Sequence, residues 1–324
     1  MWVLSTNRAE LHYFSSPEDI KDGYAALSHV WDGEEQSFQD VRRIQERCAA
    51  DRTNPRDSVC QKIRKCCELA ERHGYTWVWI DTCCIDKTSS AELSEAVNSM
   101  FRYYASARIC YGYLRDVPFF SRRLRKTPQA FGNSIWFQRG WTLQELIAPP
   151  FVVFLSRSWE PLGTKADFAE SIEAVTHIPA TVLRLQVSHR EFSIAERMSW
   201  FGRRRTTRLE DEAYCLLGLF DVYMPPLYGE GGNAFRRLQE MIMKQSTDTT
   251  LFAWQGYHAM VPDRDERACL LAPSPSAFHL VKYSDGERAP RCFQPLKATA
   301  YDVSRAALEL GDISTVADVP AATE

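Results

Sequence analysis

The sequence of 324 residues lacks any long hydrophobic run, and no stretch approaches the roughly 18 apolar residues that a membrane-spanning helix needs. Residues 1–7 also lack the cationic and extended apolar segments of a secretory leader. No charge of one sign dominates, because 39 Lys and Arg stand against 42 Asp and Glu, for a net charge of −3. The weak electrostatic field that results does not favour binding to nucleic acid or to anionic lipid. We therefore expect a cytoplasmic protein with no membrane span and no nucleic-acid partner.

Several ligand-binding and catalytic motifs are absent as well. The cysteine pairs Cys66-Cys67 and Cys83-Cys84 are adjacent, and neither C-x-x-C nor H-x-x-x-H occurs, so the sequence does not predict a zinc site. It contains no Walker loop, no complete G-x-G-x-x-G and no G-x-S-x-G elbow. We expect neither a metal nor a resident cofactor.

The composition that remains is typical of a globular protein. Hydrophobic residues make up 45% of the chain and charged residues 25%. The ten cysteines are few for this length and follow no secretory leader. We interpret them as reduced thiols that serve mostly as small core residues.

The first half of the chain alternates between predicted strands and helices. Short apolar runs predict strands at 2–4, 11–14, 24–28, 77–80, 109–114 and 151–155. Helical spacing predicts helices at 38–47, 59–70, 93–104 and 141–147, the third of them opened by a capping box of Ser89 with Glu92. This alternation indicates an α/β fold with a parallel sheet flanked by helices on both faces.

From about residue 164 the pattern becomes helical. Helices are predicted at 167–175, after Ser193 with Glu196, from Thr207 with Glu210 through Leu217, and at 234–244. After residue 254 the chain is richer in proline and poorly periodic, and no repeat of 20–50 residues occurs. We predict a helical extension that follows the sheet.

Candidate site residues collect where predicted parallel strands end, because loops at that edge converge on a crevice. They are Ser28, His29 and Trp31 after one strand, Asp81 and Asp86 after another, and Trp141 and Glu145 on the helix at 141–147. Trp141 and Glu145 lie four residues apart and so share a helix face. Five of the candidates also have a structural interpretation: Trp141 as core, Glu145 as a surface acid, His29 as a satisfied strand-end histidine, and Asp81 and Asp86 as caps and turn residues. As ligands, Asp81 and Asp86 could instead hold a cation.

Other features favour structural interpretations. Ser28 and His29 point to opposite faces of a strand, so they cannot act on each other as nucleophile and base. The glycines of residues 228–232 precede a helix and could hold a phosphate, although a plain turn is the better interpretation. The arginine clusters at 122–126 and 203–205 are interpreted as solvated loop charges.

Four strings together resemble one family. Residues 24–31 (YAALSHVW), 79–86 (WIDTCCID), 140–149 (GWTLQELIAP) and 208–230 (RLEDEAYCLLGLFDVYMPPLYGE) are similar to the fungal heterokaryon-incompatibility (HET) domain family, over about residues 1–254. The resemblance implies a role in fungal nonself recognition, with the domain as the effector of programmed cell death after incompatible hyphae fuse. This family has also been proposed as a remote relative of Toll/interleukin-receptor (TIR) domains.

The TIR resemblance implies a catalytic residue. Residues 141–146 (WTLQEL) are similar to the W-x-L-x-E-L string of plant TIR domains, whose glutamate is catalytic in NAD hydrolysis. By that match Glu145 is the catalytic carboxylate and NAD is a substrate, not a cofactor. The other substrate-binding residues would be Ser28, His29, Trp31, Asp81, Asp86 and Trp141. Cleavage of the nicotinamide–ribose bond builds positive charge on the ribose, which a fixed carboxylate stabilises.

The predicted organisation has three parts. Residues 1–160 form a TIR-like (flavodoxin-like) core, 161–254 a helical extension of the HET domain, and 255–324 an accessory segment. The alternative function is a non-enzymatic signalling or oligomerisation module that triggers death through a partner. No repeat suited to recognition occurs in this chain, so either the sensing part lies on another protein, such as a NOD-like protein, or residues 255–324 carry it. We also expect self-association.

Overall fold

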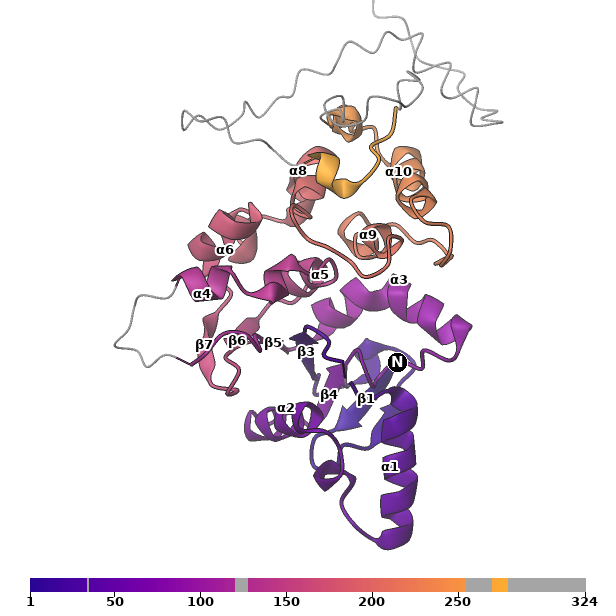
Figure 1. The fold of residues 1–324 in the computed structure, drawn as a ribbon, viewed down its shortest axis with the longest axis vertical. Coiled ribbons are helices and arrows are strands. Elements are labelled where there is room, and N and C mark those ends of the chain that lie inside the picture. Colours follow the sequence, from indigo (N-terminus) through magenta and orange to yellow (C-terminus); the bar gives the residue numbers. More distant parts are fainter. Residues whose placement is uncertain (34, 120–127, 255–269, 279–324) are drawn as a thin grey trace, which may run out of the picture.

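A computed structural model describes residues 1–33, 35–119, 128–254 and 270–278. Its centre is one seven-stranded sheet with the order β2-β1-β4-β3-β5-β6-β7 (Figure 1). The strands are β1 (Trp2–Ser5), β2 (Leu11–Tyr13), β3 (Ala25–His29), β4 (Trp77–Ile80), β5 (Ile109–Tyr113), β6 (Val152–Leu155) and β7 (Pro161–Thr164). Six of them confirm the predicted strands to within two residues at either end.

The predicted parallel pairing holds for the four central strands. β4, β3, β5 and β6 run parallel to one another, whereas β1, β2 and β7 pair antiparallel at the two edges. Short connections explain the pairings of β1 with β2 and of β6 with β7, because a link of a few residues can join only antiparallel neighbours. The chain crosses from β4 over β3 to reach β5, so the strand order reverses at β3 and a crevice is expected outside the carboxyl ends of β3 and β5.

Helices cover both faces of the sheet, as predicted. α1 (Phe38–Asp51) and α2 (Gln61–Arg72) lie on one side, and α3 (Ser90–Ser106) and α5 (Thr142–Ile147) lie on the other (Figure 1). Ser89 caps α3 by accepting a hydrogen bond from the Glu92 amide at 3.3 Å, which confirms the predicted start of that helix. Trp79 of β4 is fully buried against Tyr104 of α3, with ring centroids 5.2 Å apart, so this side of the core is aromatic.

The predicted helical extension is present. It contains α6 (Ala169–Thr176), α7 (Ala180–Leu183), α8 (Ile194–Ser199), α9 (Asp211–Tyr214) and α10 (Asn233–Gln245), and a short α4 (Pro128–Gly132) precedes α5. The capping box of Ser193 with Glu196 is confirmed at α8. The predicted helix from Thr207 through Leu217 is wrong: α9 starts after Glu210, ends at Tyr214, and is followed by a separate 3-10 turn at residues 217–219.

The sheet reaches slightly past the predicted boundary at residue 160, because β7 pairs with β6. Its sequence starts with proline and its side chains are only half-buried or exposed, so it carries little strand signal. Within the predicted accessory segment, residues 270–278 are described. They contact α8, and the Gln239 side chain of α10 exchanges two hydrogen bonds with the backbone of Ala272.

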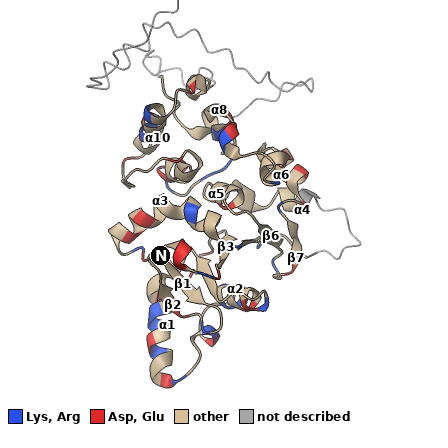
Figure 2. Cartoon of the chain, turned by 180° about the vertical axis from the view of Figure 1, so that it is seen from behind, with Lys and Arg blue, Asp and Glu red and all other residues tan. Residues whose placement is uncertain are grey.

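The eight cysteines in the described ranges are all unpaired thiols, and seven of them are buried. That finding fits their interpretation as small core residues. Acidic and basic residues alternate along exposed helices such as α1 instead of gathering by sign (Figure 2). Within the described part of the chain, no helix combines the length and apolar character needed to cross a bilayer.

Candidate functional site

A buried hydrogen-bonded chain links β3 to α5 at the carboxyl edge of the sheet. The Ser28 hydroxyl donates to Oε2 of Glu145, and the Trp136 indole Nε1 donates to Ser28 Oγ at 2.8 Å. Ser28 is fully buried, and Glu145 is only 5% exposed. Ser28 and Glu145 are 117 residues apart in the sequence. They meet because α5 packs at the carboxyl end of β3. The structure therefore joins two of the predicted site residues directly.

The carboxyl group of Glu145 is held largely in its neutral form. Burial, and next the charge of Asp81, raise the pKa of Glu145 to about 8, while the hydrogen bond from Ser28 opposes that rise. A buried carboxyl in this range can exchange a proton near neutral pH. The influence of Asp81 also shows that the ends of β4 and α5 belong to one electrostatic cluster.

Trp31, Asp81 and His29 form the second part of this cluster. Trp31 Nε1 donates to Asp81 Oδ2 at 2.8 Å, and Asp81 Oδ1 lies 3.9 Å from His29 Nε2. Trp31 is 39% exposed, whereas the His29 side chain is fully buried. The cluster therefore runs from an exposed indole to a buried imidazole, and it uses three of the predicted residues.

His29 is neutral in this setting. Burial lowers the pKa of its imidazole well below the ordinary value, and the nearby charges of Lys62, Lys87 and Arg139 lower that pKa further. His29 Nε2 lies 3.8 Å from Glu35 Oε1 and 3.9 Å from Asp81 Oδ1. Because the ring is neutral, neither contact is an ion pair. Neither ring nitrogen has a hydrogen-bond partner in the structure, although buried polar groups are usually paired. Burial also raises the pKa of Asp81.

Charged side chains that the sequence analysis did not single out surround these residues. Lys62 bridges Asp32 and Glu35, its Nζ lying 2.8 Å from Asp32 Oδ2, and Arg115 pairs with Asp32. Lys87 and Arg139 lie over the Trp31 ring, 3.9 Å and 5.9 Å from its centroid. The signal for them was weak, because Lys87, Arg115 and Arg139 are single cations in loops or turns and Lys62 is one of several cations on α2.

Two predicted site residues lie apart from the cluster. Asp86 Oδ1 accepts hydrogen bonds from Gln39 and from both the amide and the hydroxyl of Thr88, as a turn residue before α3 does. Trp141 is half-buried beside Asp211, where its hydrogen bond offsets part of the rise that burial causes in the pKa of Asp211. Although Trp141 and Glu145 are four residues apart, only Glu145 reaches Ser28.

The interpretation of residues 203–205 as solvated charges holds for Arg203 and Arg205, which are exposed, and is wrong for Arg204. Its guanidinium is buried and donates to the Arg139 carbonyl at 2.9 Å and to Thr142 Oγ1 at 2.8 Å, while its Nη2 has no partner. Burial lowers the pKa of Arg204 to about 10. This arginine therefore ties the helical extension to the first turn of α5, which carries Glu145.

The other sequence features have structural roles or lie outside the described residues. The amides of Gly229 and Gly231 both donate to Glu210 Oε1, at 2.8 Å and 3.0 Å, so a carboxylate already occupies these glycine donors. The arginine cluster at 122–126 falls in a range that the structure does not describe. In the described ranges, no group of three or more His, Cys, Asp and Glu side chains is arranged to hold a metal ion.

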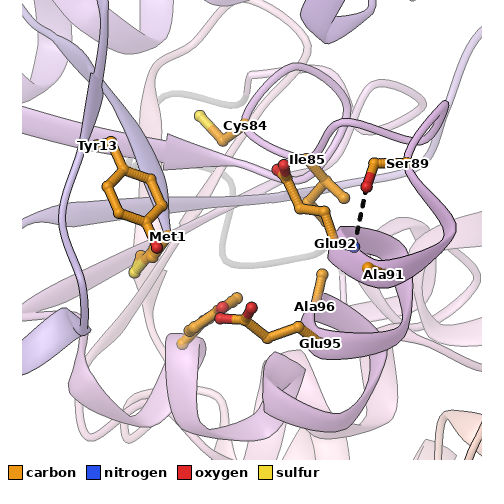
Figure 3. Close-up of a pocket in the computed structure, with 10 residues that line it drawn as sticks. Met1, Tyr13, Cys84, Ile85, Ser89, Ala91, Glu92, Glu95 and Ala96 are labelled. Carbon is orange, nitrogen blue, oxygen red and sulfur yellow. Dashed lines mark hydrogen bonds between the residues drawn. The ribbon is translucent and has the colours of Figure 1, made fainter.

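A cavity of about 240 Å³ lies elsewhere, between the N-terminal strands and the start of α3 (Figure 3). Tyr13, Cys84, Glu92 and Glu95 are among its lining residues. None of the predicted site residues lines it. The cluster of polar residues at the carboxyl edge of the sheet and this cavity are therefore separate features.

Comparison with known proteins links the chain to fungal incompatibility. Residues 24–118 match the family model described as "Heterokaryon incompatibility protein (HET)", and residues 233–295 match "Domain of unknown function (DUF8212)". The "Vegetative incompatibility protein HET-E-1" of Podospora anserina is 45% identical over 227 residues, which cover 68% of this chain and 16% of that protein. The chain therefore spans about one sixth of the length of this relative. No solved structure gave a significant match.

The HET match covers β3, β4 and β5 and so includes Ser28, His29, Trp31 and Asp81, whereas Glu145 lies beyond it. The longer match to the Podospora protein extends the similarity over most of the chain. Together, these two matches support the conclusion that the chain is a member of the heterokaryon incompatibility family.

Proposed function

We propose that this chain is an effector module of vegetative incompatibility and that it acts by cleaving the nicotinamide–ribose bond of NAD at Glu145. The family membership supports the incompatibility role. The observation that supports the chemistry best is the buried Glu145 carboxyl, which Ser28 orients at the carboxyl edge of the parallel strands. A carboxylate fixed in this way stabilises the positive charge that develops on the ribose.

The proposal includes a TIR-like, flavodoxin-like core. The four parallel strands, numbered among themselves, are ordered 2-1-3-4, as are the first four strands of a flavodoxin-like sheet. Ligands of such sheets bind where the strand order reverses, which in this chain is beside Ser28 and the end of β5. Glu145 of the WTLQEL string lies on α5 and accepts the hydrogen bond of Ser28 at that edge, which supports this assignment.

A second function has its own support. Glu145 is buried, its carboxyl is hydrogen-bonded, and the 240 Å³ cavity lies away from it. A group placed in this way also suits a non-enzymatic module, in which Glu145 fixes α5 and a partner executes death. Under this alternative, replacement of Glu145 changes stability and leaves no NAD chemistry to lose.

Nicotinamide release from NAD by the purified chain separates the two functions. We expect wild type and Glu46→Gln, a control for an exposed acid on α1, to release nicotinamide, and Glu145→Gln to lose at least about 100-fold of that rate. The carboxylate must be ionised to stabilise the transition state, so kcat/KM should rise with pH up to about 8. Equal rates of nicotinamide release for Glu145→Gln and wild type would reject the enzymatic function. Since the active form is expected to self-associate, the absence of release by wild type even after its self-association is induced would reject that function as well.

A further inference from the structure

Trp31 presents a partly exposed ring at the rim of the cluster, with two cations over it. Lys87 Nζ lies 3.9 Å from the ring centroid, and the guanidinium carbon of Arg139 lies 5.9 Å from it. Lys87 comes from the loop after β4, and Arg139 comes from the turn before α5. Three separate segments of the chain therefore meet at one indole.

The two cations have few partners of their own. Lys87 donates to the Thr82 carbonyl at 3.3 Å, and within the described ranges neither Lys87 nor Arg139 forms an ion pair with a carboxylate. The neighbouring cations Lys62 and Arg115, by contrast, form ion pairs with Asp32. Both cations act on the Asp81 carboxylate through their charge but form no direct ion pair with it, so most of their N–H donors remain available to an anion.

Polar groups without partners lie directly behind the indole. His29 is buried with both ring nitrogens unpaired, and Asp81 Oδ1 is unpaired as well. Asp81 also holds the indole through its other carboxylate oxygen. Unpaired buried groups are costly in a finished core, so their presence beside two cations without a direct ion pair indicates a place where a ligand completes the hydrogen bonding.

We infer that Trp31, Lys87 and Arg139 form the subsite that binds the diphosphate of a nucleotide. This inference rests on the proposed function, and it identifies the residues that hold the diphosphate of the substrate NAD. A guanidinium binds phosphate oxygens through a planar pair of donors, and an ammonium adds a point charge. Two cations from different segments suit two adjacent phosphates. The indole offers an apolar surface to a sugar or base beside them.

Binding of ADP-ribose tests this subsite, because ADP-ribose carries the diphosphate but has no nicotinamide–ribose bond to break. Calorimetry on the full chain should show binding that weakens as salt is added. Lys87→Gln and Arg139→Gln should each weaken it about 10-fold or more. Lys65→Gln and Arg43→Gln, which remove exposed cations of α2 and α1, should change it by less than about twofold. The Arg139 side chain has no described hydrogen bond, so that variant should keep the fold.

The two proposals fail in different ways. If ADP-ribose binds as expected while NAD stays intact, the subsite stands and the hydrolysis fails. If NAD is cleaved and neither Lys87→Gln nor Arg139→Gln changes its KM, the hydrolysis stands and the subsite fails. Binding of inorganic pyrophosphate as tight as that of ADP-ribose would overturn the assignment to a nucleotide, as would equal affinity of both variants and wild type for ADP-ribose.

Discussion

Replacement of Glu145 by glutamine should change how the stability of the protein depends on pH. The pKa of Glu145 is about 8 in the fold against an ordinary 4.5, so between these values the folded chain keeps a proton that the unfolded chain has lost. Stability falls as pH rises wherever the folded state binds more protons. The free energy of unfolding of wild type should therefore decrease from about pH 5 to about pH 8 through this group.

The magnitude follows from the same pKa. At about 1.4 kcal/mol per unit of pKa, the difference corresponds to about 5 kcal/mol over the whole interval. A glutamine has no proton to lose and can still accept the hydrogen bond of Ser28. Glu145→Gln should therefore gain stability relative to wild type as pH rises, by up to this amount.

Urea unfolding, followed by circular dichroism at several pH values between about 5 and 8, measures this difference. Glu46→Gln, on the exposed side of α1, is the matched control and should track wild type. Because Glu145 and Asp81 influence each other's ionisation, the difference between the two curves reports the titration of Glu145 together with its effect on Asp81. Parallel curves for wild type and Glu145→Gln would refute the reasoning that Glu145 is buried and protonated in the fold.

Two further predictions concern the packing around the site. Gly218→Ala should lose about 1–3 kcal/mol of stability, because the new Cβ would lie 2.0 Å from Cβ of Phe101 on α3. In the control Gly232→Ala, the new Cβ meets nothing within 4 Å. Equal melting temperatures for the two variants would contradict this prediction. Lys165→Met should lose about 1–3 kcal/mol, because Lys165 Nζ donates to the carbonyls of Leu146 and Pro149 at the end of α5; chemical denaturation beside Lys65→Met checks it, and equal midpoints would count against that role.

Local signals in the sequence account for most of the central sheet. The apolar run at 77–80 predicted a buried strand, and Ser89 with Glu92 predicted the start of α3, because both depend on neighbours in the chain. β7 was missed because its four residues include proline and glycine and have no fully buried side chain. An edge strand of this kind owes its existence to β6, not to its own sequence.

The site was only partly predictable, for a related reason. Strand ends and the WTLQEL string pointed to Ser28, Asp81 and Glu145, which the structure gathers at one edge. Trp136 and Arg204 gave no signal, since their contacts join residues 62 to 108 positions apart. The burial of Arg204 depends on where the extension docks, which periodicity does not encode.

The most direct test of the central claim is a joint measurement of NAD content and survival in fungal cells after induced expression of this chain. With wild type, and with Glu46→Gln at the same protein level, NAD should fall before survival does. With Glu145→Gln, both NAD and survival should remain at the level of uninduced cells. Death of cells that express Glu145→Gln, with NAD unchanged, would contradict the claim that the cluster around Glu145 is the working site of the effector.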